Sequence, residues 1–258
     1  MYSVFFIFKD LIMQNPPVVL SFSGHDPTGG AGIQADHEAI IAMGCHAVSI
    51  ITCLTVQDTH NVASIKPLDA EYILQQARKL LADIKISAFK IGLVGSCDIV
   101  IALASLLKQY PQIPVVFDPV LAAGGGTSLA KSELLHCIQT QLLPVVTLVT
   151  PNVPEAQALS IFDGACENIL LTGTHNESTK DVINILYRGG KVLSALSWSR
   201  LPDVYHGSGC TLASAIAAGV ANGLSLIDSV EVAQQYTWDS LSQARKVGGG
   251  QLIPLRSF

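Results

Sequence analysis

Short apolar runs alternate with stretches of helical periodicity along most of this chain, starting at Val18. An apolar run bounded by turn residues is typical of a buried strand, and apolar residues at helical spacing predict an amphipathic helix. Regular alternation of the two predicts an α/β fold, with a central, mostly parallel sheet and helices on both faces. The expected strands are 18–22, 47–54, 63–66, 88–94, 115–117, 148–150 and 169–172, and the expected helices are 32–43, 69–83 with Asp69 as the N-cap, 98–110 and 132–142.

The rhythm changes in the last third of the chain. Segments 182–187 and 192–198 flank Arg188-Gly189-Gly190, which predicts a β-hairpin. Two helices, 209–221 and 225–246, are expected to close the fold. Because no linker or repeat interrupts the series, we expect a single domain over 17–258, preceded by a functionally unimportant extension over 1–16. The apolar run in that extension is too short to span a membrane and lacks a signal peptide's basic start and cleavage site.

The charge pattern excludes one class of partner. Charged residues make up only 14% of the 258 residues, against 49% hydrophobic ones, and the formal net charge is −5 without any basic run. Binding to a nucleic-acid backbone requires clustered Lys and Arg, so nucleic acid is not an expected partner. No segment fits the P-loop pattern G-x-x-x-x-G-K-[ST] either. Anionic ligands are therefore expected to be held by backbone geometry and metal ions.

The cysteines indicate a reducing environment. None of them forms a C-x-x-C pair, which argues against a zinc site or a redox dithiol. Four fall in apolar runs, where a free Cys behaves as a small hydrophobic residue. We therefore expect free thiols and a cytoplasmic location. The six cysteines are Cys45, Cys53, Cys97, Cys137, Cys166 and Cys210.

The sharpest local feature is the turn His206–Thr211, which leads directly into an alanine-rich helix. Its two glycines allow close backbone approach to a ligand, and the helix start points free N–H groups and a positive dipole end at it. This arrangement suits an anion, although a plain tight turn onto a close-packed helix has the same composition. Cys210 is expected at or near the first helical position, where a thiol pKa is lowered. We therefore expect a thiolate that accepts a proton or acts as a nucleophile, with a buried structural Cys as the alternative.

The stretch 206–218 resembles the anion-hole segment of the ribokinase-like superfamily, in the form found in hydroxymethylpyrimidine/phosphomethylpyrimidine kinases. Most sugar kinases of the superfamily have an aspartate where this chain has Cys210, and the Cys form is shared with the pyridoxal-kinase branch. The resemblance extends over residues 17 to 250. It implies a ribokinase-like fold and a catalytic group formed by Gly207, Ser208, Gly209 and Cys210.

Segment 23–36, SGHDPTGGAGIQAD, resembles the longest motif of the same family. The match implies that Gly24 lines a pyrimidine pocket and that Asp36 helps to bind the substrate, whereas a solvated charge is the alternative for Asp36. Residues 30–35 also fit the GxGxxA pattern of dinucleotide-binding folds. We reject an oxidoreductase, which remains the rival from another class, because the strand ends well upstream and no acidic residue follows about twenty positions later to hold a ribose.

Three further motifs extend the predicted substrate pocket. Segment 52–59, TCLTVQDT, resembles a family motif whose glutamine, here Gln57, would hydrogen-bond the aminopyrimidine edge. The KIGL and DPV segments at 90–93 and 118–120 resemble motifs that would supply Leu93 and Val120 as apolar walls.

The phosphate and metal end is expected at two later strand ends. Asp118 ends a buried strand, where a carboxylate needs a partner or a cation. Segment 150–156, TPNVPEA, resembles the superfamily's N-x-x-E motif and would make Glu155 the second Mg²⁺ ligand, partly through water. Helix capping is the alternative for Asn152 and Glu155. The residues expected to bind ATP are Asn152, Thr172, Thr174 and Thr211.

The resemblance is weaker at two positions near the expected nucleotide. Thr172 stands where the family often has a lysine, and the lysine often seen after the DPV motif is missing from residues 122–127. Backbone N–H groups, including those of 124–126, threonine hydroxyls and Mg²⁺ would have to offset the phosphate charge.

The resemblance as a whole implies transfer of a phosphoryl group from MgATP to a hydroxymethylpyrimidine and to its monophosphate, by a homodimer. Pyridoxal kinase activity and a catalytically silent pyrimidine-binding protein remain alternatives.

Overall fold

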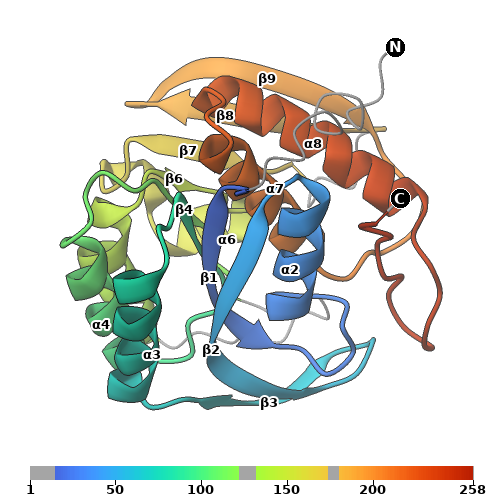
Figure 1. Ribbon diagram of the computed structural model, residues 1–258. Helices are drawn as coiled ribbons and strands as arrows, with labels where there is room; N and C mark the ends of the chain where they lie inside the picture. The colour runs from blue at the N-terminus through green and yellow to red at the C-terminus, as the bar shows by residue number, and fades with distance from the viewer. Residues whose placement is uncertain (1–14, 122–131, 174–179, 258) are drawn as a thin grey trace.

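The computed structural model of the chain describes residues 15–121, 132–173 and 180–257 and contains one nine-stranded sheet (Figure 1). The strand order is β3-β2-β1-β4-β5-β6-β7-β8-β9. The bounds are β1 Val18–His25, β2 His46–Gln57, β3 Val62–Pro67, β4 Ala88–Ile91, β5 Val115–Phe117, β6 Leu148–Val149, β7 Asn168–Leu171, β8 Asp181–Arg188 and β9 Lys191–Ser199.

The six central strands, from β2 to β7, pair in parallel. The antiparallel strand β3 covers one edge, and the predicted hairpin of β8 and β9 extends the other. The strand order reverses at β1, because the chain places β2 on one side of it and β4 on the other. In open α/β sheets, ligands bind outside the carboxyl ends of the strands at such a switch point. The topology therefore places the candidate site next to the ends of β1 and β4.

Helices cover both faces of the sheet, and each face has its own apolar core (Figure 1). One face packs on α2, α7 and α8, and the other on α3, α4, α5 and α6. The predicted α/β class with helices on both faces is confirmed. The bounds are α2 Gly32–Ala42, α3 Ala70–Asp83, α4 Cys97–Leu107, α5 Ser132–Cys137, α6 Val153–Ala158, α7 Ser208–Ala221 and α8 Leu226–Ser242.

Several element boundaries differ from those expected. The strand predicted over 88–94 ends at Ile91. The next residue, Gly92, lies where the side chains of Ser23 and Lys90 leave no room for a Cβ. The helix predicted over 132–142 is α-helical only to Cys137 and continues as a π-helical turn. The short helix α6 was expected only through the capping alternative at its first residues.

The expectation that all six cysteines are free is wrong. Cys97, the first residue of α4, and Cys137, the last residue of α5, form a disulfide with their Cα atoms 5.7 Å apart. The two residues lie 40 positions apart in an apolar context, so local sequence gives no indication of the pairing. The other four cysteines are free and buried.

Within the described part of the chain, no helix combines the length and the apolar character needed to cross a membrane. Residues 1–14 lie outside the described ranges, so the division of the chain at residue 16 stays a prediction.

Candidate active site

The predicted substrate residues lie at the carboxyl ends of the central strands. Gly24 is near the end of β1, and a Cβ placed on it would lie 3.0 Å from Sγ of Cys53 and 3.2 Å from Cδ2 of Leu93. The structure thus brings Gly24 and Leu93 together. Gln57 is the last residue of β2, and both Gln57 and Val120 are half-buried. Their predicted contacts with a pyrimidine stay predictions.

The two glycine turns that the sequence singled out touch each other. Gly207 has a φ of +73°, and a Cβ at this position would collide with the carbonyl oxygen of Gly30. The backbone N–H of Gly32 donates a hydrogen bond to the sulfur of Cys210. The start of α7 therefore lies against the loop after β1, as the motifs predicted for a shared site.

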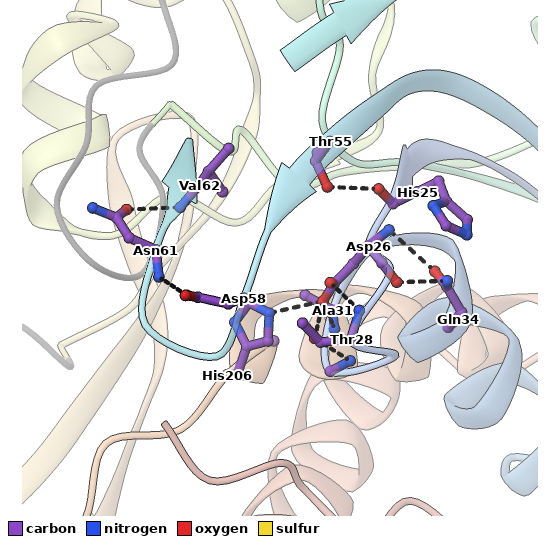
Figure 2. A network of polar contacts seen from close by, with 12 residues as sticks. His25, Asp26, Thr28, Ala31, Gln34, Thr55, Asp58, Asn61, Val62 and His206 are labelled. Atoms are coloured by element: carbon purple, nitrogen blue, oxygen red, sulfur yellow. Dashed lines mark hydrogen bonds and ion pairs between the residues drawn. The ribbon is translucent and has the colours of Figure 1, made fainter. Parts of the chain in front are cut away.

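A side-chain pair joins the same two turns (Figure 2). Nε2 of His206 lies 2.8 Å from Oδ2 of Asp26. Asp26 also accepts hydrogen bonds from the backbone N–H groups of Thr28 and Ala31, both at 2.8 Å, which folds the loop around the carboxylate. Burial acts to raise the pKa of Asp26, but the hydrogen bonds from His206 and Thr28 outweigh it, and the pKa is lowered.

The first turn of α7 offers free amides next to a carboxylate. Gly207 is the N-cap and has no side chain to cap the helix, and the first helical hydrogen bond runs from the N–H of Thr211 to the carbonyl oxygen of Gly207. The N–H groups of Ser208, Gly209 and Cys210 therefore have no acceptor within the helix. Gly209 is exposed, and a Cβ placed on it would lie 3.5 Å from Oδ1 of Asp118. This geometry can hold an anion.

A fully buried ion pair lies beneath this turn. Nζ of Lys90 lies 2.8 and 2.9 Å from the two carboxylate oxygens of Asp36, which also accept hydrogen bonds from the hydroxyls of Ser21 (2.6 Å) and Ser214 (2.8 Å). Burial acts to lower the pKa of Lys90, but the charges of Asp36, Cys210 and Asp118 outweigh it, and the pKa is raised.

This ion pair changes the interpretation of two residues. Substrate binding by Asp36 stays a prediction, and the structure gives its carboxylate another task, which is to hold Lys90. Lys90 was not assigned a role of its own from the sequence. The sequence did contain a signal for this role, because Lys90 stands between apolar residues of a short strand. All four residues of that strand are buried, and a buried charge requires a partner.

The expected thiolate at Cys210 is wrong for this structure. Burial, together with the charges of Asp118 and Asp36, raises the pKa of the Cys210 thiol to about 12, against the lowering effect of Lys90 and the Gly32 amide. The helix-start effect on which the prediction relied is smaller than the cost of removing a thiolate from water. The protonated thiol instead donates a hydrogen bond to Asp118.

The two predicted metal ligands are electrostatically coupled. Burial raises the pKa of Asp118 to about 6, and burial together with the Asp118 charge raises the pKa of Glu155 to about 8. Oδ2 of Asp118 is buried and has no hydrogen-bond partner among the described residues. An unpartnered carboxylate oxygen near a second carboxylate fits a hard cation such as Mg²⁺. No group of three or more Asp, Glu, His or Cys side chains suited to a metal occurs in residues 15–121, 132–173 and 180–257.

The residues expected at the nucleotide lie on two neighbouring strand ends and on α7. Asn152 caps α6, and the N–H of Thr172, after β7, donates to the carbonyl oxygen of Pro151 at 2.9 Å. The hydroxyl of Thr211 is fully buried and donates to the carbonyl oxygen of Gly207 at 2.8 Å. ATP contacts by these residues stay predictions. Thr174 and the glycines at 124–126 lie outside the described residues.

The sequence profile of the phosphomethylpyrimidine kinase family matches residues 26–255. The chain belongs to this family. It is 35% identical to the hydroxymethylpyrimidine/phosphomethylpyrimidine kinase of Streptomyces coelicolor, over 91% of this chain and 92% of that protein. It is 32% identical to the enzyme of the same name from Escherichia coli, over 93% and 96% of the two chains.

Other relatives of the family are longer. The chain is 33% identical to a bifunctional thiamine biosynthetic enzyme of Arabidopsis thaliana, over 94% of this chain but only 50% of that protein. It thus spans about half the length of such bifunctional relatives.

Solved structures confirm the ribokinase-like fold expected from the motifs. Phosphomethylpyrimidine kinase from Clostridium difficile superposes with a TM-score of 0.73 at 29% identity, over 86% of this chain and 97% of that one. Pyridoxal kinase from Bacillus subtilis, in an ADP complex, gives a TM-score of 0.84 at 24% identity, over 93% and 97%. At that identity the second likeness concerns the fold alone.

Proposed function

We propose that this chain transfers the γ-phosphoryl group of ATP to the hydroxymethyl group of 4-amino-5-hydroxymethyl-2-methylpyrimidine, and then to the resulting monophosphate, in thiamine biosynthesis. The observation that carries the proposal is the uncapped start of α7, which presents free amides beside Cys210 and Asp118 at the switch point of the sheet. The names of the relatives that match nearly end to end supply the substrate.

The amides of Ser208, Gly209 and Cys210 stabilise the negative charge of the phosphoryl group during transfer. The substrate oxygen forms the new O–P bond, the bond between the γ-phosphorus and its bridging oxygen breaks, and ADP leaves. Such reactions depend chiefly on positioning and electrostatic stabilisation. Gly24, Leu93, Gln57 and Val120 hold the pyrimidine, as their motifs imply.

Cys210 accepts the proton of the substrate hydroxyl. A thiol with a pKa of about 12 carries its own proton at neutral pH, so this role requires the surrounding charge to change. The carboxylates of Asp118 and Asp36 favour the protonated thiol, whereas the ammonium of Lys90 favours the thiolate. Lys90 is therefore the residue that makes Cys210 usable as a base once the carboxylate charge is offset.

Asp118 and Glu155 would hold Mg²⁺, and their coupled, raised pKa values and the unpartnered Oδ2 of Asp118 support this assignment. A divalent cation there would offset the charge of the two carboxylates and of the nucleotide phosphates. Asn152, Thr172, Thr174 and Thr211 contact ATP in this proposal, with no lysine at the family's usual positions.

The decisive measurement is ADP release with the hydroxymethylpyrimidine, and separately with its monophosphate. Both substrates are expected to stimulate release, with pyridoxal as a weaker substrate. A clear preference for pyridoxal would reassign the protein to pyridoxal phosphorylation. Thermal stabilisation by the pyrimidine without any ADP release would identify a silent binding protein.

The proposal also includes a homodimer and a cytoplasmic location. Scattering should give a mass of about twice the 27.3 kDa of one chain. Because disulfides are rare in the cytoplasm, a cytoplasmic location requires that the bond between Cys97 and Cys137 is reduced inside cells and forms afterwards, so both residues should react with a thiol reagent in unfolded protein taken directly from cells. A monomer mass, or thiols that stay blocked, would overturn these two points.

A further inference from the structure

The C-terminal segment 244–257 lies against several parts of the site. It pairs with the strand-like segment before the α7 turn, because the N–H of Leu252 donates to Val204 and the N–H of His206 donates to Leu252. It also contacts the β2–β3 turn, where the N–H of Gly250 donates to the hydroxyl of Thr59 at 3.0 Å. We call this segment the C-terminal clasp. It was given no role on the basis of sequence.

Near the end of the clasp, Arg256 is buried to 1% exposure and donates to three acceptors. Nε donates to the hydroxyl of Thr211 at 2.8 Å, one terminal nitrogen donates to Glu38 at 3.0 Å, and the other donates to the carbonyl oxygen of Gly30. Helix α8 also holds the backbone of Arg256 in place, because the hydroxyl of Tyr236 donates to the carbonyl oxygen of Arg256 at 2.7 Å.

Two of these acceptors belong to the two glycine turns of the site. Gly30 is in the loop after β1, and Thr211 is in the first turn of α7, where its hydroxyl donates on to Gly207. The guanidinium also lies close to Gly207, since a Cβ at that position would be 3.0 Å from one of its terminal nitrogens. Arginine is suited to joining the two turns because its planar guanidinium group donates hydrogen bonds in fixed directions and remains charged when buried.

The positive charge of Arg256 lies next to the first turn of α7. The sequence lacks two lysines that the family often has near the nucleotide, and Arg256 places a buried cation directly behind the free amides of α7. Its carboxylate partner, Glu38, has a side chain that is 52% exposed, so water screens the negative charge more than the positive one. Arg256 therefore adds a positive charge next to the start of α7.

We infer that Arg256 is a positioning residue for phosphoryl transfer, which fixes the free amides of α7 against the loop after β1 and adds positive charge behind them. The inference rests on the proposed function and deepens it. The family profile ends at residue 255, so the family match itself gives no information about this residue.

The test compares Arg256→Gln and Arg256→Lys with Arg245→Gln, which makes the same change at an exposed arginine of the same segment. Arg256→Gln should lower kcat for ADP release about tenfold to hundredfold and leave KM for the pyrimidine within about twofold, because a small displacement of the amides affects the transferring group most. Arg256→Lys, which keeps the charge but loses the fork, should fall between Arg256→Gln and the wild type. Arg245→Gln should match the wild type.

A purely structural role is separated by two further measurements. Guanidinium ion at millimolar concentration should restore part of the kcat of Arg256→Ala, whereas the same concentration of sodium ion should not. Hydrogen exchange should accelerate at the hydrogen-bonded amide of Thr211 in Arg256→Gln and stay unchanged at α3. A folded Arg256→Gln variant with wild-type kcat, or a loss that only mirrors its unfolded fraction, would overturn the inference.

If Arg256→Gln does not fold, Thr211→Val and Thr211→Ser replace it, because the first removes the acceptor of Nε and the second keeps it. Equal kcat values for these two variants would contradict the inference. Failure of the proposed function is recognised separately, as wild-type protein that releases no ADP with either pyrimidine. In that case the exchange at the amide of Thr211, and calorimetric binding of a non-hydrolysable ATP analogue to wild type and Arg256→Gln, still decide whether Arg256 shapes the anion site.

Discussion

The starts of α6 and α7 solve the same physical problem in opposite ways. Both helices leave N–H groups without helical acceptors at their first turn. At α6, the side chain of Asn152 accepts from the N–H of Glu155, and the side chain of Glu155 accepts from the N–H of Asn152, both at 2.9 Å. At α7, the N-cap is Gly207, which offers no side chain, and the amides of the first turn have no acceptor among the residues that the structure describes.

The first amides of α6 are capped by side chains of the helix itself, whereas the first turn of α7 is uncapped and is fixed in place by distant residues. The capping box of α6 uses residues three positions apart. The start of α7 is fixed by Asp26 through His206 and by Arg256 through Thr211, across 180 and 45 positions of sequence. Amides that are kept free for a ligand require support from elsewhere, and in the proposed function α7 is the reactive end.

The largest effect is expected at the reactive end itself. Cys210→Ala should lower kcat by roughly 10²–10⁴ without unfolding the protein, because it removes the proposed proton acceptor. ADP release in the presence of the pyrimidine measures it, with Cys166→Ala, at a buried cysteine that faces β7, as the control. Wild-type turnover in Cys210→Ala would show that another group takes the proton.

Lys90→Met tests the ion pair beneath α7. It should lower the free energy of unfolding by about 3–5 kcal/mol, since Asp36 is left as an unpaired charge at 0% exposure. Denaturant titration measures the loss. The double variant Lys90→Met with Asp36→Leu should recover most of it, and a double variant as unstable as the sum of the two single ones would show that the residues do not act as a pair.

Gly207→Ala tests the contact between the two turns. It should cost about 1–3 kcal/mol of folding free energy and lower kcat, because φ is +73° and the new Cβ meets the carbonyl of Gly30. Gly223→Ala is the matched control, since Gly223 has a φ of +85° with open space around its Cβ position. If both variants lose the same stability and neither loses activity, the contact between the turns has no catalytic importance.

Asn152→Ala tests the capped start of α6. It should cost about 1 kcal/mol of folding free energy, as should Ser225→Ala, which removes the side-chain cap of α8 far from the site. Only Asn152→Ala should raise KM for MgATP. Equal KM values in the two variants would leave Asn152 as a helix cap alone.

The smallest effect concerns acid stability at the α7 turn. The pKa of Asp26 is lowered from its ordinary 3.8, so the stability it contributes is complete above about pH 4 and is lost as pH falls through the lowered pKa. Asp26→Asn should therefore be less stable than the wild type at pH 7 and lose less stability between pH 4 and pH 2. Thermal unfolding at both ends of this range measures the difference, and parallel curves would contradict it.

Local patterns in the sequence were sufficient for most of the fold. Strand β5 begins and ends where its apolar run predicted, and Asp69 caps α3 by accepting from the N–H of Tyr72. The hairpin around Gly189 and Gly190 was also predicted correctly, because positive φ at both residues is what its turn demands. These features depend on interactions between residues close in sequence.

The site could be predicted in outline but not in its electrostatics. The motifs predicted which residues lie at the ends of β1, β4 and β5, because the carboxyl ends of parallel strands lie along the same edge of a sheet. They could not predict that Cys210 is protonated, since its pKa depends on the burial of the sulfur and on Asp36 and Asp118, which are distant in sequence. The sequence likewise could not predict the disulfide between Cys97 and Cys137, because the two residues lie 40 positions apart and only the fold brings them together.

The amino-acid sequence by itself determined the order of strands and helices, the class of fold, the family and the two glycine turns, because short-range periodicity and local motifs encode them. Only the tertiary structure decided that these turns touch, that Lys90 and Asp36 pair beneath them and that Arg256 supports them from the end of the chain. The physical reason is that burial and charge at one point are sums over residues that the fold, and not the sequence order, brings together.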